Sequence, residues 1–315
     1  MSGAVGMSAK FTDPVLTAKG EKRASVTLHA LETVWFNTGT LCNITCAHCY
    51  IESSPQNDRL AYLSLADVRT FLDEIERDRL PTKLIGLTGG EPFMNREIIA
   101  ILSETLARGF EALVLTNAMR PMERHKRQLL ELKAAFGRRL RLRVSLDDPS
   151  AAIHDAERSE GAHAKTIDGL RWLGANGFNV EIAGRGFAHE AEQALRARFQ
   201  NVFDEVGLRI DAGDAAALVI FPEMDPDQNP PEITTACWGI LEKDPREVMC
   251  ASARMVVKRK GAAELSVLAC TLLPYDPQFE LGTTLAASSR PVQLNHKYCA
   301  SFCVLGGASC GTAKA

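Results

Sequence analysis

Three cysteines near the start of the chain are spaced closely enough to bind one metal centre together. Cys42, Cys46 and Cys49 form the pattern C-x3-C-x2-C. Three thiolates on a tight loop can hold three irons of a [4Fe-4S] cluster, and the fourth iron is then left without a protein ligand. The alternative is a structural zinc site, but such sites need four ligands, and His48 is awkwardly placed between two of the cysteines to be the fourth. The spacing therefore favours an iron–sulfur cluster with one iron open to chemistry.

The composition is that of a globular chain and argues against several classes of protein. The 315 residues are 46% hydrophobic and 24% charged, with a net charge of -3. This balance gives no overall electrostatic reason to expect a nucleic acid or an anionic membrane as the main partner. No apolar run reaches the roughly 18 residues of a membrane helix, and Met1 to Pro14 lacks the order of a secretory signal. We therefore expect a cytoplasmic protein, in which clustered thiols act as metal ligands or catalytic groups more often than as disulfides.

Short β-rich runs alternate with longer helical patterns from residue 33 onward. The expected strands are Thr33 to Asn37, Lys83 to Thr88, Ala112 to Asn117, Arg141 to Leu146, Asn179 to Ala183 and Ala217 to Phe221. Between them, apolar residues recur at helical spacing. Parallel neighbours need long right-handed crossovers, and six units are too few for a closed eight-fold barrel. The pattern predicts an α/β fold, a partial (β/α)6 TIM-like barrel.

Candidate polar residues follow each of the first five strands, at the ends where barrels place their chemistry. The cysteine loop follows the first strand, and the later strands are followed by Thr88 to Pro92, Asn117, Ser145 with Asp147, and Arg185. Prolines between residues 222 and 231 then interrupt the pattern. We expect an amino-terminal extension (1–32), the barrel (33–233) and a small, cysteine-rich α+β domain (234–315).

Two motifs together resemble the radical SAM enzyme superfamily. The cysteine loop is followed at once by Tyr50, and Thr88-Gly89-Gly90-Glu91-Pro92 comes one βα unit later. The resemblance covers residues 33–221 at the level of fold, whereas Gly-Gly-Glu-Pro taken alone is also compatible with a surface turn. It implies that the open iron binds S-adenosylmethionine and that one electron from the cluster splits it into methionine and a 5'-deoxyadenosyl radical. That radical takes a hydrogen atom from the substrate.

The resemblance also implies how the rim binds the cofactor. Gly89 and Gly90 would let the backbone approach the ligand closely, and Glu91 with the preceding carbonyls would suit the methionine ammonium. Tyr50 would lie near the adenine, or else be a core residue. A low-potential electron donor of the flavodoxin or ferredoxin type is implied as a partner.

Four polar residues at later strand ends would bind the ribose hydroxyls or the methionine carboxylate: Asn117, Ser145, Asp147 and Arg185. Arg185 is the natural carboxylate partner, because its fork can bind two oxygens. Three of them have simpler alternatives: Asn117 as a helix or turn cap, Asp147 as an Asx turn before Pro149, and Arg185 as a solvated charge.

The last quarter of the chain is similar to the carboxyl-terminal extensions of radical SAM enzymes called SPASM and twitch domains, which bind auxiliary iron–sulfur clusters. Its candidate ligands are Cys250, Cys270, Cys299, Cys303 and Cys310. A hairpin over residues 254–270 would bring the first two together, and Cys310 competes with Cys299 or Cys303 for the remaining places. The count favours one auxiliary cluster, expected to be [4Fe-4S], and Cys237 is most simply a buried small residue. Zinc is the alternative, since thiolate spacing alone does not choose the metal.

A fully ligated auxiliary cluster can accept an electron, which suits oxidation of a peptide or small-molecule substrate. We therefore expect an oxidoreductase or maturase, with a radical group transferase or a non-catalytic zinc protein as alternatives. Four residues expected between the two metal sites are suspects for a proton acceptor or substrate contact: Glu223, Tyr275, His296 and Tyr298. A basic run at residues 258–260 is more simply a solvated turn than an RNA site, so nucleic acid is not expected as a partner.

Overall fold

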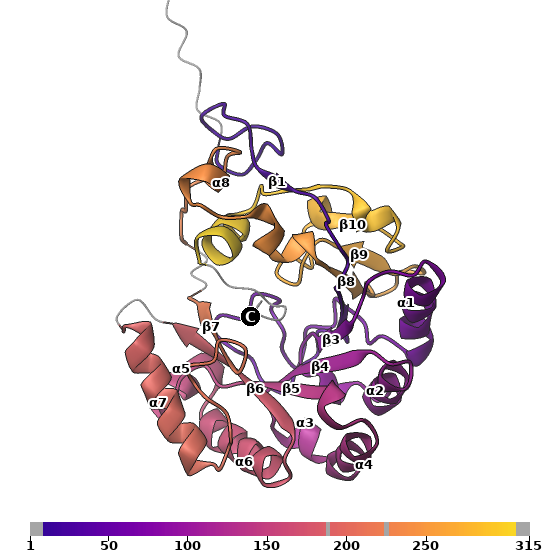
Figure 1. The fold of residues 1–315 in the computed structure, drawn as a ribbon, viewed down its shortest axis with the longest axis vertical. Coiled ribbons are helices and arrows are strands. Elements are labelled where there is room, and N and C mark those ends of the chain that lie inside the picture. The colour runs from indigo at the N-terminus through magenta and orange to yellow at the C-terminus, as the bar shows by residue number, and fades with distance from the viewer. Residues whose placement is uncertain (1–8, 187–189, 224–226, 307–315) are drawn as a thin grey trace, which may run out of the picture.

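A computed structural model describes residues 9–186, 190–223 and 227–306. Its centre is a nine-stranded sheet in the order β10-β9-β8-β2-β3-β4-β5-β6-β7 (Figure 1). Six neighbouring parallel strands form the barrel: β2 (Thr33–Asn37), β3 (Leu84–Thr88), β4 (Glu111–Thr116), β5 (Leu140–Ser145), β6 (Asn179–Gly186) and β7 (Leu218–Pro222). Each overlaps one of the six predicted strands, and the predicted α/β class with a partial barrel is confirmed.

Helices between these strands cover the outer side of the sheet (Figure 1). They are α1 (Leu65–Arg77), α2 (Ile98–Ala107), α3 (Arg120–Glu123), α4 (Lys126–Phe136), α5 (Ala151–Arg158), α6 (Ala162–Ala175) and α7 (Glu192–Glu205). Short 3-10 turns include η1 (Pro92–Met94), η2 (Gly137–Arg139), η3 (Pro245–Glu247), η4 (Met249–Ala251), η5 (Pro277–Phe279) and η6 (Ala287–Ser289). The start of α1 is set by a capping box, in which Ser64 and Asp67 each accept a hydrogen bond from the other's backbone amide.

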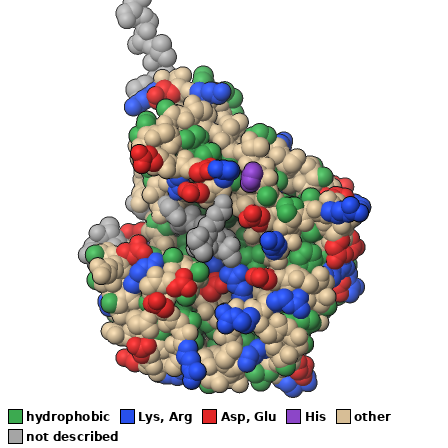
Figure 2. Space-filling model, in the orientation of Figure 1, with side chains coloured by type: hydrophobic (Ala, Val, Ile, Leu, Met, Phe, Trp, Pro, Cys, Tyr) green, Lys and Arg blue, Asp and Glu red, His purple; other side chains and the backbone are tan. Residues whose placement is uncertain are grey.

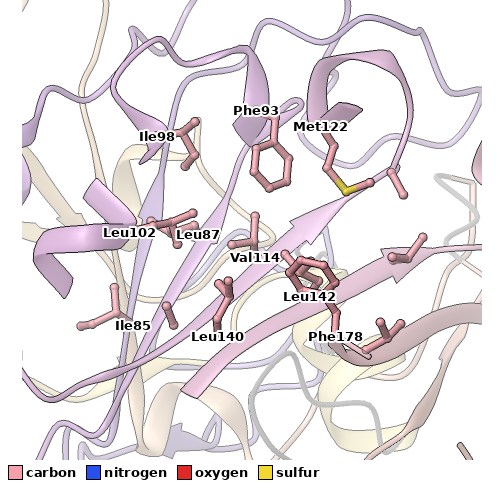
Figure 3. Close-up of a cluster of buried hydrophobic side chains, with 14 of the residues drawn as sticks. Ile85, Leu87, Phe93, Ile98, Leu102, Val114, Met122, Leu140, Leu142 and Phe178 are labelled. Atoms are coloured by element: carbon pink, nitrogen blue, oxygen red, sulfur yellow. The ribbon is translucent and has the colours of Figure 1, made fainter. Parts of the chain in front are cut away.

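The main core lies between the sheet and these helices. Figure 3 shows Ile85 and Leu87 of β3 with Val114 of β4, next to Ile98 and Leu102 of α2. All five side chains are fully buried. Truncating one of them, as in Leu102→Ala, is expected to cost about 2–5 kcal/mol of folding stability.

The other face of the sheet turns into the barrel and combines one large apolar side chain with buried charge. Trp35 of β2 is fully buried over Gly86 of β3, where an added Cβ would come within 2.2 Å of the indole. On β5 and β6, Arg143 and Arg141 both pair with Glu181. Because successive side chains of a strand point to opposite faces, residues 141 and 143 share the inner face.

Residues after 234 extend the same sheet. β8 (Ala253–Val257) lies parallel beside β2, and β9 (Ser266–Leu268) and β10 (Glu280–Gly282) follow as antiparallel neighbours. The predicted hairpin over residues 254–270 is confirmed by the pairing of β8 with β9. The sheet therefore continues through the position at which we expect a domain boundary. This segment also contains α8 (Cys237–Ile240), β11 (Val292–Gln293) and the π-helix η7 (Cys299–Leu305).

The described part of the amino-terminal extension packs against the carboxyl-terminal segment. β1 (Ser25–Val26) pairs antiparallel with β11. Arg23, 2% exposed, donates to Glu232 at 2.6 Å, and the Glu232 carboxylate also accepts from the backbone amides of Phe11 and Ala18. Both contacts tie residues 11–26 to the last third of the chain.

Candidate active site

A cavity lies at the carboxyl ends of the parallel strands. It holds about 1060 Å³ of open space, part of it continuous with solvent. The predicted site residues that line it are Cys42, Cys46, Cys49, Tyr50, Gly89, Gly90, Asn117, Ser145, Asp147 and Arg185. Further lining residues, not predicted from the sequence, include Ile44, Ile51, Ser53, Thr116, Arg143, Arg158, Phe221 and Phe302. The space is sufficient for a drug-sized cofactor beside a small cluster.

The cysteine loop presents three thiols to this cavity from different depths. Cys42 is buried, whereas Cys46 and Cys49 are partly exposed. Burial raises the pKa of the Cys42 thiol to about 12, and burial also raises the pKa of Cys46. Thiols bind metals as thiolates, so a bound metal has to supply the positive charge that stabilises the deprotonated form here.

The end of α5 anchors the cysteine loop. The amide of Ala47 donates to the carbonyl of Glu157 at 2.7 Å, and the Glu157 carboxylate lies 2.8 Å from Nδ1 of His48. Arg185 donates to Glu157 at 3.1 Å and to the carbonyl of His48 at 3.2 Å. The loop is therefore held from β6 and α5, and Arg185 is not the freely solvated charge of the alternative interpretation.

The Gly89-Gly90 turn is packed against the start of the cysteine loop. Gly89 has φ +132°, and Cβ atoms added to Gly89 and Gly90 would come within 2.4 Å of the Gly39 carbonyl and 2.1 Å of the Leu41 carbonyl. The amide of Gly90 donates to Gly39 at 2.8 Å, and that of Glu91 donates to Leu41 at 3.2 Å. The two glycines thus permit contact between two backbone segments, while their remaining surface lines the cavity.

Glu91 lies behind the cavity wall and orders it. Its carboxylate accepts hydrogen bonds from the hydroxyl of Thr116 and the amide of Asn117, both at 2.9 Å, and from the amide of Phe93 at 3.2 Å. Burial raises the pKa of Glu91 to about 7, although these hydrogen bonds oppose the shift. Glu91 is not among the cavity-lining residues, and its bonds fix the ends of β3 and β4 relative to each other.

An acidic residue and two arginines form a charged wall. Arg158 of α5 makes a forked contact with Asp147, at 2.7 and 3.0 Å, and Nε of Arg185 lies 3.5 Å from the same carboxylate. Burial is the largest single effect and would raise the pKa of Asp147, but the charge and hydrogen bonds of Arg158 together with the charge of Arg185 outweigh it, so this pKa is lowered. The alternative interpretation of Asp147 as an Asx turn is wrong, because the turn is formed by Asp148, which accepts from the amide of Ser150 at 2.6 Å.

Asn117 caps the turn that precedes α3, whose first turn has no side-chain cap of its own, and also contacts the cysteine loop. Its side-chain oxygen accepts from the amide of Met119 at 3.1 Å. Its amide nitrogen donates to the side chain of Asn43 at 2.9 Å. Asn117 therefore connects the end of β4 to the cysteine loop.

The carboxyl-terminal segment reaches the cavity through Phe302. This residue lines the cavity and stacks on Phe221 of β7, with 5.4 Å between ring centroids. It is preceded by Cys299 and followed directly by Cys303 in the π-helix η7. One short helix therefore carries both a wall of the cavity and candidate ligands of the second region.

Three of the carboxyl-terminal cysteines, Cys250, Cys270 and Cys299, lie close enough to influence each other's ionisation. The charges of Cys270 and Cys250 both raise the pKa of Cys299, after burial as the largest cause. Burial also raises the pKa of Cys250 to about 11. Cys303 follows Cys299 by four residues on the same π-helix, and Cys310 lies outside the described residues.

A buried cation lies among these thiols. Arg254 is fully buried, and burial lowers its pKa to about 10, opposed by Cys250 and then Cys270. Its Nε donates to the carbonyl of Ser288 and one terminal nitrogen donates to the carbonyl of Cys250, but the other terminal nitrogen has no hydrogen-bond partner in the described chain. A buried guanidinium without a carboxylate partner is costly unless another negative group neutralises it.

The four suspects for acid–base chemistry do not line the cavity. The hydroxyl of Tyr275 donates to the carbonyl of Ile51 at 2.9 Å, so this residue supports the segment after the cysteine loop. His296 is half-buried and packs edge-on against Tyr298, 4.8 Å between centroids. Glu223 is exposed directly after Pro222, which does line the cavity.

The described ranges contain neither a disulfide, nor a ready-made site for a single metal ion, nor a membrane-spanning helix. None of the eight cysteines described forms a disulfide, and no three His, Cys, Asp or Glu side chains there are grouped closely enough to hold a single metal ion. No helix within the described ranges is both long and apolar enough to cross a membrane.

Comparison with known proteins identifies the family. The model of the radical SAM superfamily matches residues 36–194, half of the chain. The chain therefore belongs to the radical SAM superfamily, a family of enzymes. Membership implies a [4Fe-4S] cluster and S-adenosylmethionine as cofactors.

Individual relatives share part of this chain. AlbA of Bacillus subtilis (strain 168), an antilisterial bacteriocin subtilosin biosynthesis protein, is 28% identical over 53% of the chain and 35% of AlbA. The mycofactocin maturase MftC of Mycolicibacterium smegmatis is 26% identical over 44% of the chain and 33% of MftC. The structure of Streptococcus suis SuiB bound to S-adenosylmethionine has a TM-score of 0.58 at 11% identity, over 82% of this chain and 64% of SuiB. The matched region spans about a third of the two curated relatives.

The residues present fit these implied cofactors. Three thiols reach one cavity without a fourth ligand near enough to form a mononuclear site in the described chain. A cluster tolerates this spread, because separate irons bind the separate thiolates. The cavity lining beside the thiols includes three arginines, Arg143, Arg158 and Arg185. They pair with Glu181, Asp147 and Glu157, and could also donate to an anionic group.

Proposed function

We propose that this chain cleaves S-adenosylmethionine reductively and oxidatively modifies a peptide or a small molecule. The observation that carries the proposal is the single cavity in which the three thiols meet the Gly89-Gly90 turn and the charged wall. A peptide substrate is supported by the names of AlbA and MftC, a bacteriocin biosynthesis protein and a maturase. SuiB, similar in fold, has also been solved with a precursor peptide.

We assign Cys42, Cys46 and Cys49 as ligands of the cluster. When bound, the cluster and S-adenosylmethionine supply the one-electron chemistry that abstracts a hydrogen atom from substrate. The contacts from Glu157 and Arg185 fix the loop that carries these ligands, so the thiols are positioned before cofactor binding. Preorganisation of this kind lowers the entropy lost on binding.

The charged wall is assigned to the carboxylate of S-adenosylmethionine. Arg158 and Arg185 both contact the carboxylate of Asp147, and Arg185 also pairs with Glu157. Both guanidinium groups also line the cavity beside the thiols, where they can donate further hydrogen bonds to a carboxylate. Asp147 fixes the orientation of the Arg158 fork. Tyr50, Asn117 and Ser145 line the rest of the cavity and are assigned to the adenosine. Glu91 acts from behind, by holding the turn and the amide of Asn117.

The carboxyl-terminal cysteines are assigned to one auxiliary [4Fe-4S] cluster, held in the cysteine-rich domain from residue 234. Cys250, Cys270 and Cys299 would be ligands, with Cys303 or Cys310 as the fourth. The unpartnered nitrogen of Arg254 supports an anionic occupant, because a thiolate-ligated cluster carries the negative charge that this cation lacks. Such a cluster supplies single-electron acceptance, which suits an oxidation. A zinc–thiolate centre is the alternative occupant.

The proposal is tested on anaerobically purified protein. Iron and sulfide analysis should give about seven to eight irons for two cubane clusters, whereas zinc without sulfide would contradict it. Cys46→Ala should abolish formation of 5'-deoxyadenosine with dithionite as reductant. Cys237→Ala is the matched control, since this thiol belongs to neither proposed ligand set, and it should retain activity.

Product mass separates oxidation from group transfer. Oxidation removes two hydrogens from the substrate, whereas a radical transferase adds a methyl group or another fragment of S-adenosylmethionine. A product heavier than its substrate would favour transfer over the oxidation proposed here.

A further inference from the structure

A second hollow lies on the outer side of the cysteine loop. It holds about 1190 Å³ of open space, part of it continuous with solvent. Its walls come from the cysteine loop, η1, α3 with the residues beside it, and α6: Asn43, Ile44, Met94, Met119, Arg120, Pro121, Glu123, Arg124, Lys165 and Asp168. We call this hollow the cationic groove.

The rim of the cationic groove has positive charge that the chain itself does not neutralise. Arg120, Arg124 and Lys165 are exposed, and none of them forms an ion pair or a side-chain hydrogen bond with another described residue. The two acidic residues of the groove are engaged elsewhere. Glu123 pairs with Lys126 at 3.2 Å and Asp168 pairs with Arg171 at 3.1 Å, and neither of these partners lines the groove. Arg120, Arg124 and Lys165 are therefore available to pair with acidic groups of a partner.

The unpaired cations contrast with the rest of the surface. On the face shown in Figure 2, basic and acidic side chains are interspersed. Many arginines elsewhere form ion pairs with acidic residues of the same chain. Arg108, for example, pairs with Glu104, Asp73 and Glu76. The net charge of -3 also gives the whole molecule no general attraction for anions. The positive rim is thus a local feature.

The floor of the groove is apolar and adaptable. Met119 is buried, and Met94 and Ile44 are partly buried. Methionine side chains are flexible and polarisable, so they fit varied partner surfaces. An apolar floor with a charged rim is the usual anatomy of a protein–protein interface.

The groove and the active-site cavity share a wall. Ile44 lines both hollows and lies between Cys42 and Cys46. The side chain of Asn43 accepts from Asn117, a cavity residue, at 2.9 Å, and lies 3.7 Å from the sulfur of Met119 in the groove. A partner seated in the groove would therefore be separated from the proposed cluster by the cysteine loop alone.

We propose that the cationic groove docks an acidic electron-transfer protein of the flavodoxin type, which reduces the cluster of Cys42, Cys46 and Cys49. The inference rests on the proposed function, because only that function needs a single-electron donor at this loop. In the step, the reduced flavin of the donor loses one electron and is oxidised, and the cluster gains it. Arg120, Arg124 and Lys165 steer the acidic partner and set its orientation, which acts mainly on the association rate.

The test compares a protein donor with a small chemical reductant. In the reconstituted holoenzyme, the triple variant R120E/R124E/K165E should bind an acidic flavodoxin at least roughly tenfold more weakly than wild type at low salt. The difference should shrink between about 0.01 and 0.1 M NaCl, as the Debye length falls from about 30 to about 10 Å. The control is R77E, which reverses an exposed charge on α1 outside the groove and should bind as wild type does.

The same variants separate this inference from the proposed function. With dithionite, the triple variant and wild type should form 5'-deoxyadenosine at equal rates, whereas with reduced flavodoxin the triple variant should be slower. Equal flavodoxin affinity and equal flavodoxin-driven rates in both proteins would overturn the docking site. No 5'-deoxyadenosine from wild type with dithionite would instead overturn the proposed function. Equal loss of flavodoxin binding in R77E would show general charge attraction and would also overturn the groove.

Discussion

Phe302 of the π-helix η7 stacks on Phe221 of β7 and closes one side of the cavity, with an angle of 26° between the rings. Phe302 is directly followed by Cys303 in the chain, so the second cysteine region and this wall of the active site form one structural unit. In this fold the carboxyl-terminal segment completes the partial barrel as well as carrying thiols.

Replacing Phe302 should disturb substrate chemistry more than the first cluster. Phe302→Ala removes the ring that covers Phe221, at a cost of about 3–5 kcal/mol of folding stability. We expect S-adenosylmethionine cleavage to continue with dithionite while the yield of product per 5'-deoxyadenosine falls, because the wall no longer shapes the substrate site. Phe302→Leu should restore much of the yield. An unchanged ratio in Phe302→Ala would contradict a role for this wall.

The Gly89-Gly90 turn should not tolerate a side chain at its second position. Gly90→Ala places a Cβ within 2.1 Å of the Leu41 carbonyl, so the start of the cysteine loop has to move. Such overpacking typically costs about 1–3 kcal/mol. We expect iron content to fall by about the equivalent of one cluster. Gly239→Ala is the control, because nothing lies within 4 Å of its added Cβ. Full iron content in Gly90→Ala would show that the contact is not needed.

Glu91 should make the stability of the protein depend on pH near neutrality. Its pKa in the folded state is raised to about 7 by burial, so the folded state binds a proton that the unfolded state has already released. The stabilisation is fully present below the unfolded pKa of about 4.3 and is lost as pH rises through about 7. At about 1.4 kcal/mol per pKa unit, the loss is at most roughly 4 kcal/mol.

The neutral variant Glu91→Gln isolates this effect. It loses one acceptor for the amides of Phe93 or Asn117, which is a cost that does not vary with pH. Relative to wild type, its free energy of unfolding in urea should therefore rise between about pH 5 and pH 8. A difference that stays constant over this range would mean that Glu91 is charged at both ends of it.

Arg254 should influence the potential of the auxiliary cluster. Its buried positive charge, close to Cys250 and Cys270, stabilises the more negative reduced state. Arg254→Met should therefore shift the midpoint potential of the second cluster to a more negative value, as measured by EPR-monitored titration, and leave the first cluster unchanged. Arg254→Lys, which keeps the charge, should shift it less. A second centre that holds zinc would show no such potential and would contradict the assignment.

The positions of the strands and of most lining residues followed from the sequence because they depend on local signals. β2 begins and ends at the predicted residues. The basic turn with Gly261 between two apolar runs predicts the hairpin of β8 and β9. The rule that parallel strands share a carboxyl edge was enough to place Asn117, Ser145 and Asp147 at one cavity.

The remaining features depend on contacts between distant segments, which periodicity does not encode. The pairing of Arg158 with Asp147 requires the path of α5 to be known. The position of β8 beside β2 joins residues more than two hundred positions apart. The sequence does contain one further signal. Arg141 and Arg143 alternate with leucines in β5, and this alternation predicts that β5 has a polar face toward the inside of the barrel. Residue type alone suggests Tyr275 and His296 as acid–base groups, whereas their observed contacts are with the carbonyl of Ile51 and the ring of Tyr298.

The most direct test of the central claim is the EPR spectrum of the reduced protein with and without S-adenosylmethionine. If the trio of thiolates leaves one iron open, the cofactor binds that iron and changes the spectrum of one cluster, and Cys46→Ala removes both that cluster and the change. A reduced spectrum that S-adenosylmethionine leaves unaltered in wild type would contradict the account.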